Sequence, residues 1–356
     1  MGIRYERDSR RATNGPLIFF SIAKDEAFEE EIRSAFISGL SFYAYRFPND
    51  SMMCYGSSEG YEVGLDHPGF VIGRFEPGLP IITIPYNGAK SNDTSIESYE
   101  MPDTSTKYEE YSKEVEGIVA SLQNHPKSKV VAARVLIKEN EFDIAELFYT
   151  LCQRFPDAFV FCFSTPATGC WIGASPELLL SGREDNLQSM ALAGTRPLGA
   201  IGEWDKKNIE EQRIVTDYIS DIFKAQNLFP SIGNPQTLAT GKIEHICTGI
   251  SATRDKDFNL EKMIRALSPT PALCGEPKDF ALKKIHEYEK FDRGCYGGFC
   301  GPYHSISDFS FNVVLRCASL TERKICLYAG GGITNHSDVE SEWKETEMKL
   351  SNTFGL

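Results

Sequence analysis

The chain has 356 residues, 41% of them hydrophobic and 12% aromatic, and a formal net charge of −13 at pH 7. This composition supports a sizeable core, and the acidic excess argues against nucleic acid or an anionic membrane as a partner. The ten cysteines form no C-x-x-C pair, and no run approaches the roughly 20 apolar residues of a membrane span. We therefore expect a soluble, cytoplasmic protein with reduced thiols, folded as a single domain over 1–356.

Apolar patterning predicts several strands and two helices in the first half of the chain. The polar, aperiodic stretch 87–106 predicts a loop, and helical spacing of apolar residues begins directly after it. The predicted strands cover 16–22, 69–76, 80–86 and 128–137, with a hairpin of 158–163 and 170–175, and the predicted helices cover about 106–124 and 143–154.

The second half continues with one long helix and two further strands. The helix, over about 205–226, is predicted by apolar residues at helical spacing, namely Val215, Tyr218, Ile219, Ile222 and Phe223. The strands, over 242–248 and 308–318, alternate well enough to be half-buried. Many antiparallel-looking strands, a few long helices and no G-x-G-x-x-G βαβ unit predict an α+β fold, with large antiparallel sheets, rather than a doubly wound sheet.

The C-terminal stretch carries a polar stripe. Glu342, Glu345 and Lys349 are spaced three and four residues apart, so they fall on one face of a helix. A glycine run at 330–332 precedes this helix, and its bare backbone amides can approach an anion without interference from a Cβ atom. Two carboxylates and a cation beside such a loop suit a metal-bound anionic substrate.

Four more ionisable residues occur where apolar ones are expected. Glu211 lies on the apolar stripe of the 205–226 helix, Lys129 opens an apolar strand, and His245 is flanked by apolar residues. Arg316 is expected on the face of the 308–318 strand opposite Phe309. Buried ionisable groups are costly unless they are paired or used. Each could be structural on its own, as a helix-start carboxylate, an exposed strand end or a core histidine, but together they predict a metal and dianion site.

Seven ordered segments resemble the chorismate-utilising enzyme family, which includes isochorismate, salicylate, anthranilate and aminodeoxychorismate synthases. These segments are Ser175–Leu180 (SPELLL), Ala191–Pro197 (ALAGTRP), Ser268–Gly275 (SPTPALCG), Phe291–Gly298 (FDRGCYGG), Leu315–Ala318 (LRCA), Tyr328–Ile333 (YAGGGI) and Glu342–Lys349 (EWKETEMK). The resemblance runs in order from about residue 107 to the C-terminus. It implies the chorismate-binding fold of anthranilate synthase component I, with a catalytic core over 107–356 and a less specific N-terminal part over 1–106.

The resemblance also implies a role for individual residues. Lys129 matches the general base that activates water, Glu177 the general acid that protonates the departing C4 hydroxyl, and His245 a histidine near the ring C4 oxygen. The apolar flank of Glu177 is expected to raise the pKa of its carboxyl. The implied Mg²⁺ ligands are Glu211 and Glu345, with Glu342 reached through water. The implied substrate-binding positions are Ala193, Gly194, Thr195, Ala272, Tyr296, Arg316, Gly331, Gly332 and Lys349.

The reaction within the family is indicated by a few positions. A lysine at 129 resembles the members that use water rather than ammonia, and Ala272 resembles isochorismate synthases, whereas Ser268 departs from the histidine of many relatives. We expect a monomeric, Mg²⁺-dependent isochorismate synthase acting on chorismate, in menaquinone or siderophore biosynthesis, with the menaquinone type favoured. The alternatives are a salicylate synthase, an anthranilate or aminodeoxychorismate synthase component I, and a chorismate-binding subunit without activity.

Overall fold

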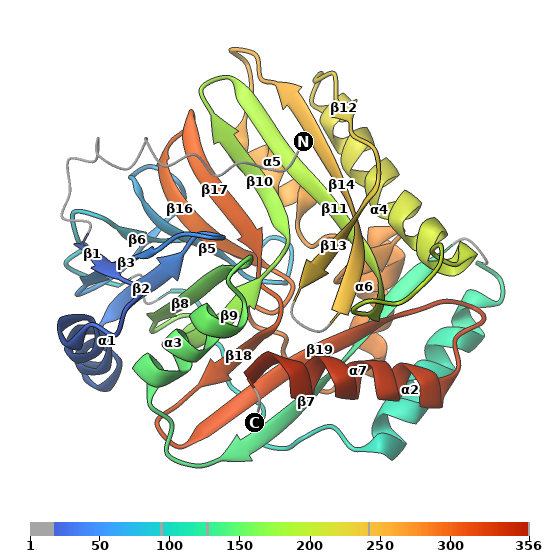
Figure 1. The fold of residues 1–356 in the computed structure, drawn as a ribbon, viewed down its shortest axis with the longest axis horizontal. Helices are drawn as coiled ribbons and strands as arrows, with labels where there is room; N and C mark the ends of the chain where they lie inside the picture. Colours follow the sequence, from blue (N-terminus) through green and yellow to red (C-terminus); the bar gives the residue numbers. More distant parts are fainter. Residues whose placement is uncertain (1–17, 93–94, 126–127, 241–242, 355–356) are drawn as a thin grey trace.

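Two large antiparallel sheets form the centre of the molecule, with helices packed around them (Figure 1). The structure is a computed structural model that describes residues 18–92, 95–125, 128–240 and 243–354. The nine-stranded sheet has the order β1-β3-β2-β8-β9-β18-β19-β7-β15. Its strands are β1 (Ile18–Ser21), β2 (Ser41–Arg46), β3 (Met52–Ser58), β7 (Lys129–Glu139), β8 (Phe159–Thr165), β9 (Gly169–Ser175), β15 (Gly275–Glu276), β18 (Cys317–Leu320) and β19 (Lys324–Ile333).

The ten-stranded sheet has the order β12-β14-β11-β10-β17-β16-β5-β6-β4, and β13 pairs with β14 beside this path. Its strands are β4 (Glu62–Val63), β5 (Gly69–Gly73), β6 (Ile82–Pro85), β10 (Leu178–Arg183), β11 (Asn186–Pro197), β12 (Ser231–Ile232), β13 (Gln236–Thr240), β14 (Ile243–Thr253), β16 (Phe299–Ser305) and β17 (Asp308–Val313). The helices are α1 (Glu26–Ser38), α2 (Tyr108–Leu122), α3 (Ile144–Arg154), α4 (Lys206–Ala225), α5 (Leu260–Leu267), α6 (Lys278–Tyr288) and α7 (Val339–Phe354).

Both faces of the nine-stranded sheet are buried, and β8 shows why its sequence is apolar throughout. Phe159, Phe161 and Phe163 point into a core that also contains residues of the ten-stranded sheet. Val160 and Cys162, on the opposite face, belong to a second core that includes residues of α1, α3 and α7. Because successive strand residues face opposite sides, a strand covered on both faces needs a continuous apolar run.

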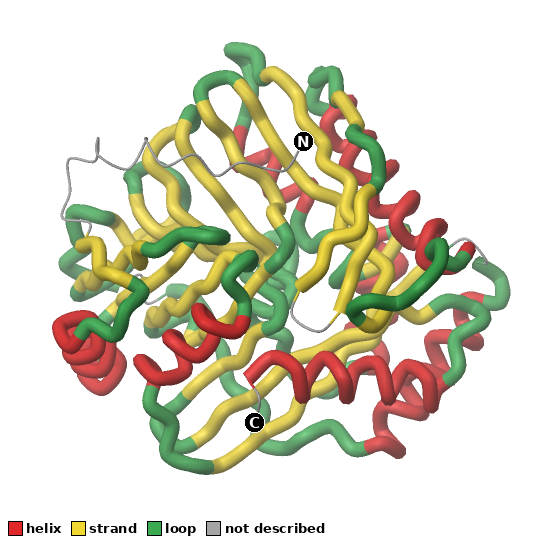
Figure 2. The backbone as a smooth tube through the Cα atoms, viewed as in Figure 1, coloured by secondary structure: helices red, strands yellow, loops and turns green. Residues whose placement is uncertain are grey.

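Two helices bring polar groups to the region where the sheets meet. Helix α4 packs on β11 and β14, and α7 packs on β19 (Figure 2). Asp205 caps α4, since its carboxylate accepts a hydrogen bond from the backbone N–H of Asn208 at 2.8 Å. An N-cap of this kind satisfies one of the exposed amides of the first helical turn. The cap therefore fixes where α4 begins, and with it the positions of Lys207 and Glu211.

The structure confirms the α+β class and most of the predicted elements. The predicted helices correspond to α2, α3, α4 and α7, the predicted hairpin is β8–β9, and the stretch 87–106 contains no helix or strand among its described residues. Residues 16, 17 and 242 of predicted strands lie outside the described residues. Within the described ranges, no helix is both long and apolar enough to cross a membrane. The elements missed in the sequence are the helices α1, α5 and α6 and the strands β2, β3, β4, β10, β11, β12, β13, β15, β16 and β19. The glycine run at 330–332, expected as a loop, is part of β19, because its backbone pairs with residues 131–133 of β7.

One strand prediction was wrong in a way that matters for the site. The stretch 308–318 is not one strand: β17 belongs to the ten-stranded sheet and β18 to the nine-stranded sheet. Arg316 lies in the crossover between them with a φ of 46°, in the left-handed region. Such a conformation is unfavourable for a residue with a Cβ and ends the strand. Arg316 is therefore placed by the crossover, and not by the alternation of a strand opposite Phe309.

Candidate active site

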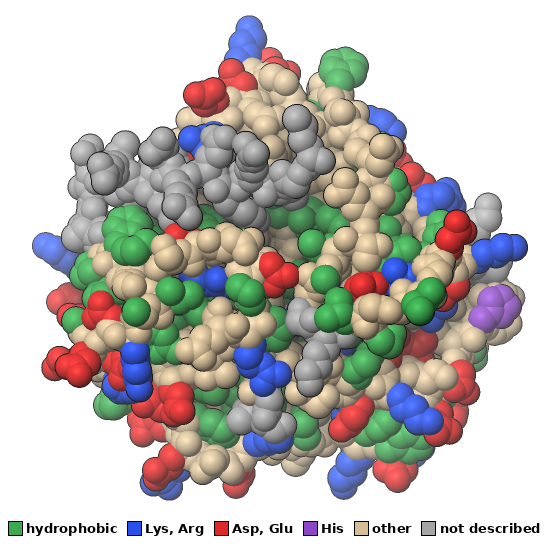
Figure 3. All heavy atoms as spheres, in the orientation of Figure 1, with side chains coloured by type: hydrophobic (Ala, Val, Ile, Leu, Met, Phe, Trp, Pro, Cys, Tyr) green, Lys and Arg blue, Asp and Glu red, His purple; other side chains and the backbone are tan. Residues whose placement is uncertain are grey.

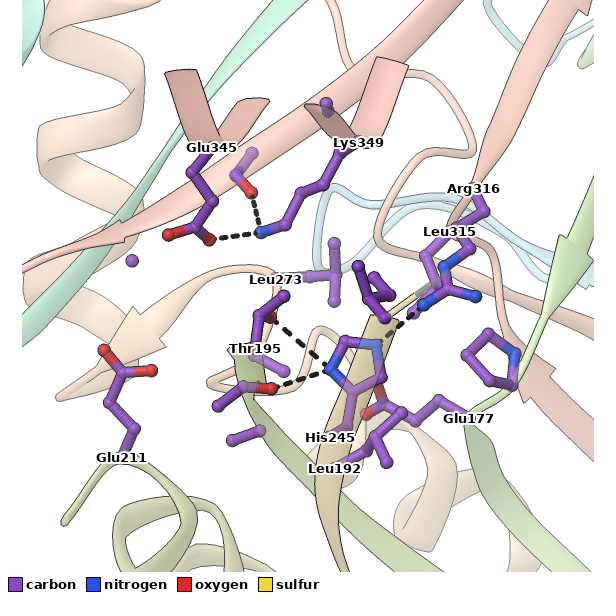
Figure 4. Close-up of a pocket in the computed structure, with 18 of the residues that line it drawn as sticks. Glu177, Leu192, Thr195, Glu211, His245, Leu273, Leu315, Arg316, Glu345 and Lys349 are labelled. Carbon is purple, nitrogen blue, oxygen red and sulfur yellow. Dashed lines mark hydrogen bonds and ion pairs between the residues drawn. The ribbon is translucent and has the colours of Figure 1, made fainter. Parts of the chain in front are cut away.

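A cavity of about 130 Å³ lies where the two sheets, α4 and α7 meet (Figure 4). This is about ten times the volume that one buried water needs, so the cavity can hold a small organic molecule. Thirteen of the fifteen residues predicted for the site line it. They are Lys129, Glu177, Ala193, Gly194, Thr195, Glu211, His245, Ala272, Tyr296, Arg316, Gly332, Glu345 and Lys349. The other two, Gly331 and Glu342, do not line it, and the buried Glu342 side chain lies beside Gly331.

Two buried ionisable groups, one on the nine-stranded sheet and one in the link between the two sheets, line the cavity. Lys129, the first residue of β7, is 4% exposed and packs over Gly332, where an added Cβ would approach the lysine Cε to 2.3 Å. Glu177, in the link between β9 and β10, is 2% exposed. Burial raises the pKa of the Glu177 carboxyl to about 8, although a hydrogen bond from Thr270 and the charge of Lys129 oppose this shift. Glu177 is thus mostly protonated at neutral pH and can act as an acid.

His245 on β14 links the backbone of β11 to Arg316. Its Nδ1 lies 2.7 Å from the carbonyl oxygen of Gly194, and its Nε2 lies 2.7 Å from Nη2 of Arg316. Nδ1 must carry the hydrogen, because only a donor can bond a carbonyl, and this leaves Nε2 to accept from the guanidinium. Burial and then the charge of Arg316 lower the pKa of His245 to about 3, so the ring is neutral at physiological pH.

Arg316 is held in place but retains unused hydrogen-bonding capacity. Its Nη2 donates to the hydroxyl of Thr240 at 2.7 Å and to His245, whereas Nη1 is buried and has no partner. Burial lowers the pKa of Arg316 to about 10, which still leaves the group charged at pH 7. A buried guanidinium with an unsatisfied nitrogen is unfavourable unless an anion completes it. Arg316 is thus suited to bind a carboxylate in the cavity.

The opposite end of the cavity is acidic and is built from helices. Glu211 of α4 and Glu345 of α7 lie at this end, away from Arg316 and Glu177 (Figure 4). Lys349 donates to Glu345 at 2.7 Å and to the carbonyl oxygen of Gly330 at 2.8 Å. The nearby charge of Lys349 lowers the pKa of Glu345, so this carboxyl is ionised at neutral pH. The cavity thus has a cationic end at Arg316 and an opposite end where carboxylates are paired with lysines.

A third carboxylate, Glu342, is buried behind the acidic end. Its Oε1 accepts from Ser337 at 2.7 Å, while Oε2 is buried without a partner. Burial, and then repulsion by Glu345, raise the pKa of Glu342. Gly331 allows this carboxylate to approach the backbone of β19, since a Cβ there would lie 2.9 Å from Oε2.

The donor set fits Mg²⁺ bound by one or two carboxylates. Glu211 and Glu345 line the cavity, and Glu342, which has one unpartnered buried oxygen, shares the contact of Lys207 with Glu211. Mg²⁺ usually takes one or two protein carboxylates and completes its octahedron with water and substrate oxygens. In the described part of the chain, no three His, Cys, Asp or Glu side chains form a metal cage of their own.

The cavity wall on the β11 side is shaped by a bulge. The pairing of β11 with β14 shifts register between Ala193 and Arg196, and Gly194 has a φ of 71°. The side chain of Asn208 accepts a hydrogen bond from the backbone N–H of Thr195 at 3.1 Å. Bulges re-aim the backbone near active sites. Here the bulge turns the Gly194 carbonyl toward His245, at the distance given above.

Two residues of the site were missed in the sequence. Lys207 lies 3.9 Å from Glu211 and 3.7 Å from Glu342, measured from its Nζ to a carboxylate oxygen of each. Its position four residues before Glu211 on a helix was a usable signal, since i and i+4 side chains are neighbours. Thr270, whose hydroxyl lies 3.5 Å from Glu177 Oε1, gives no such signal, because 93 residues separate the two.

Comparison with curated proteins identifies several isochorismate synthases. Isochorismate synthase EntC of Escherichia coli (strain K12) is 31% identical over 244 residues, which cover 64% of this chain and 62% of EntC. Isochorismate synthase DhbC of Bacillus subtilis is 30% identical over 262 residues, covering 68% and 66% of the two chains. Anthranilate synthase component 1 of Saccharolobus solfataricus is 28% identical over 223 residues, covering 58% of this chain and 52% of that protein. These matches therefore span no more than about two thirds of each relative.

The fold has a close counterpart among solved structures. The structure described as MenF, the menaquinone-specific isochorismate synthase from Escherichia coli, superposes with a TM-score of 0.76. The alignment covers 95% of this chain and 94% of that chain at 20% sequence identity. The family described as chorismate binding enzyme matches residues 84–354, a range that contains every residue of the cavity described above. The chain is a member of the chorismate-binding enzyme family.

Proposed function

We propose that this protein is a Mg²⁺-dependent isochorismate synthase, which converts chorismate reversibly into isochorismate. The observation that carries the proposal is the pair of Lys129 and Glu177 on the wall of one cavity, with Glu177 buried and protonated at neutral pH. A base and an acid on the same ligand are what this hydroxyl exchange requires. The isochorismate synthases among the relatives support the same assignment.

The reaction replaces one hydroxyl of the ring by another at a different carbon. Lys129 takes a proton from a water molecule as the oxygen of that water forms a bond to C2. The ring double bonds shift, the C4–O bond breaks, and Glu177 gives its proton to the departing hydroxyl, which leaves as water. One water is consumed and one released, so substrate and product are isomers. Catalysis then rests on positioning and on proton transfer at both ends of the shift.

The two ends of the cavity suit the two carboxylates of chorismate. The unpartnered Nη1 of Arg316 is proposed to bind the pyruvyl carboxylate, with His245 holding the guanidinium in place. The ring carboxylate is proposed to lie at the acidic end, where Glu211 and Glu345 would hold Mg²⁺ and Glu342 would contact it through water. When bound, Mg²⁺ supplies positive charge that neutralises the ring carboxylate. Lys349 and the backbone of Gly194, Thr195 and Gly332 complete this binding surface.

Members of this family differ in whether water or ammonia attacks the ring, and this distinguishes isochorismate synthases from the ammonia-using enzymes. A lysine at the start of β7 supports water activation, as the resemblance of Lys129 to the isochorismate-synthase base implies. The cavity residues Ala272, Tyr296 and Leu315 support the menaquinone type among isochorismate synthases. A salicylate synthase would form the same intermediate and then eliminate pyruvate.

The surface is compatible with a small-molecule enzyme that acts alone. Lys and Arg side chains are interspersed with acidic ones on the face shown in Figure 3, and the net charge is −13. An overall negative field disfavours anionic polymers, so the dianionic substrate must be held by local cations. We propose a cytoplasmic monomer with chorismate as its substrate.

Product analysis tests this function directly. The purified chain is incubated with chorismate and Mg²⁺, with and without ammonium, and the products are separated by chromatography. Isochorismate alone, lost when Mg²⁺ is removed with a chelator, is the expected result. Salicylate with pyruvate would identify a salicylate synthase, and an ammonium-dependent aromatic amine would contradict the role given to Lys129. Chorismate binding without turnover would contradict the enzyme assignment.

A further inference from the structure

Arg293 and Glu289 form a buried ion pair that does not line the active cavity. Their side chains are 2% and 3% exposed. Nε of Arg293 donates to Oε2 of Glu289 at 2.8 Å, and Nη2 donates to Oε1. Glu289 directly follows α6, and Arg293 belongs to the segment Phe291–Gly298, in which the reaction proposed above gives this arginine no role. Since a buried ion pair often stabilises no better than well-packed apolar residues, its other contacts indicate what it does.

The ion pair completes one edge of the strand that begins with Lys129. On this edge β7 pairs with β15, which is two residues long and ends the nine-stranded sheet. The carbonyl oxygen of Val131 accepts from Nη2 of Arg293 at 2.8 Å, and the backbone N–H of Ala133 donates to Oε1 of Glu289 at 3.0 Å. Buried backbone groups need such partners. Arg293 and Glu289 therefore supply the bonds that a longer β15 would supply.

The same guanidinium holds the turn that carries Thr270. Its Nη1 donates to the carbonyl oxygen of Leu273 at 2.6 Å. Within this turn, the carbonyl oxygen of Thr270 accepts from the backbone N–H groups of Leu273 at 3.0 Å and Cys274 at 2.8 Å. The Thr270 hydroxyl lies 3.5 Å from Oε1 of Glu177, and Leu273 lines the cavity. Arg293 thus fixes the segment that contacts the proposed acid.

The shape and charge of the guanidinium suit it to join these two segments. Burial alone would lower the pKa of Arg293, but the charge of Glu289 and its hydrogen bonds raise this pKa above its ordinary value, so the group is charged. The guanidinium lies 4.4 Å from the ring centroid of Phe75, and the carbonyl oxygen of Arg293 accepts from the backbone N–H of Tyr296 at 2.9 Å. Because its donors lie in one rigid plane, the directions of their acceptors are fixed relative to one another.

We propose that Arg293, held by Glu289, is a positioning residue of the reaction. Its guanidinium fixes β7 against the turn that carries Thr270, and so aligns Lys129 with Glu177. The inference rests on the proposed function, because it requires Lys129 and Glu177 to act on the same ligand. It adds that their alignment depends on a residue that touches neither the substrate nor Mg²⁺.

This role predicts a loss of turnover without a loss of substrate affinity. Misplacement of a reacting group by about 1 Å can lower a rate about a hundredfold. The binding groups assigned to chorismate, Arg316 at one end and the metal-binding carboxylates at the other, have no hydrogen bond to Arg293 among the described residues. A change at Arg293 should therefore lower kcat and leave KM nearly unchanged.

Arg293→Lys tests this prediction. A lysine keeps the charge and can still pair with Glu289, but a single ammonium cannot span the carbonyl oxygens of Leu273 and Val131 as the guanidinium does. We expect kcat for chorismate consumption to fall about ten- to a hundredfold, with KM and the calorimetric Kd of chorismate within about threefold of wild type. If Arg293→Lys does not fold, Glu289→Asp decides the question. The shorter carboxylate cannot reach both Arg293 and the N–H of Ala133, so the same loss of kcat is expected.

Arg46→Lys is the matched control for general loosening of the structure. Arg46 is 1% exposed and, like Arg293, donates to backbone carbonyl oxygens, namely those of Pro156 at 2.8 Å, Phe155 at 2.6 Å and Ala158 at 3.0 Å. Neither Arg46 nor these three residues line the cavity. Arg46→Lys should lower the Tm in thermal unfolding but keep the kcat of the wild type.

Three results would overturn the inference. They are a wild-type kcat in both Arg293→Lys and Glu289→Asp, an equal loss of kcat in Arg46→Lys, and a loss of chorismate affinity that matches the loss of kcat. Product identity tests the proposed function separately. Salicylate or an aromatic amine from the wild type would contradict isochorismate synthesis, whereas the comparison of kcat for chorismate consumption would still decide the role of Arg293. A wild-type chain that consumes no chorismate would contradict both.

Discussion

The two ends of the active cavity are built in different ways. The end that contains Glu177, His245 and Arg316 is carried by strands and their links. Glu177 and His245 are buried and Arg316 is half-buried, and all three are held by backbone or neighbouring groups. The end that contains Glu211, Glu345 and Lys349 is carried by α4 and α7, and its carboxylates are paired with lysines, among them Lys129 at the start of β7. Burial shifts pKa values at the first end, whereas at the second end the proposed metal would have to displace the lysines that pair with the carboxylates.

This difference predicts the largest effect for the buried acid. Glu177→Gln keeps the shape of the side chain but has no proton to give to the leaving hydroxyl. We expect turnover to fall about 10²- to 10⁴-fold, the range typical of a lost general acid. Steady-state kinetics with chorismate measures this loss, and thermal unfolding near neutral pH checks that the variant is folded. Turnover close to that of the wild type would remove Glu177 from the reaction.

Burial of the same residue predicts a pH-dependent stability. The usual pKa of 4.5 is raised to about 8 in the folded protein, so the folded state holds a proton that the unfolded state loses between these values. The stability from this buried carboxyl is complete below pH 4.5 and is lost as pH rises toward 8. The loss should be about 4 kcal/mol and absent in Glu177→Gln. Denaturant unfolding of both proteins across this range measures it, and parallel curves would contradict the burial.

Burial lowers the pKa of His245, and this predicts a second pH-dependent change in stability, at acidic pH. Its pKa falls from 6.5 to about 3 on folding, so the unfolded state binds the extra proton between these values. Stability from the neutral histidine is therefore present above pH 6.5 and lost as pH falls toward 3. The loss of stability at acidic pH should remain in Glu177→Gln, whereas the loss toward pH 8 should disappear. Denaturant unfolding of this variant across both pH ranges therefore distinguishes the contributions of the two residues.

At the end of the cavity carried by α4 and α7, a substitution should change Mg²⁺ affinity rather than proton transfer. Glu345→Gln should weaken Mg²⁺ binding by about a hundredfold or more, since even groups that only support a metal ligand contribute 10- to 100-fold. Calorimetric titration of Mg²⁺ measures this in the presence of chorismate. Glu340→Gln, on the same helix but exposed and outside the cavity, is the matched control. Equal Mg²⁺ affinity in the two variants would contradict the placement of the metal.

Removal of the Lys207 ammonium should have the smallest effect, and it should strengthen Mg²⁺ binding rather than weaken it. This ammonium lies within 4 Å of Glu211 and Glu342, where it competes with a divalent cation for the same carboxylates. Lys207→Met should therefore bind Mg²⁺ about two- to fivefold more tightly without substrate, as expected for a half-exposed ion pair. Lys206→Met, at the exposed neighbouring position, serves as the control. Weaker Mg²⁺ binding would instead mean that Lys207 holds the carboxylates in place.

The sequence predicted local structure better than the relation between distant segments. Apolar periodicity located α2, α3, α4 and α7, because each helix buries one face along its own length. The break between β17 and β18 was missed, because alternation along a strand does not reveal which sheet each half joins. The resemblance to the family predicted thirteen cavity residues, and it placed Glu342 outside direct contact with the metal, but it did not predict that Gly331 is absent from the cavity lining. Lys207 and Thr270 were missed because their roles depend on neighbours brought together by folding.

The origin of the new hydroxyl oxygen tests the central claim most directly. The chain, chorismate and Mg²⁺ are incubated in water enriched with heavy oxygen, and the isolated product is examined by mass spectrometry. If Lys129 activates water for addition at C2, isochorismate should carry one heavy oxygen at C2, and the Lys129→Met variant should form almost none of it. Isochorismate without heavy oxygen would mean that the hydroxyl moves within the substrate, and this would contradict water addition from the Lys129 side of the cavity.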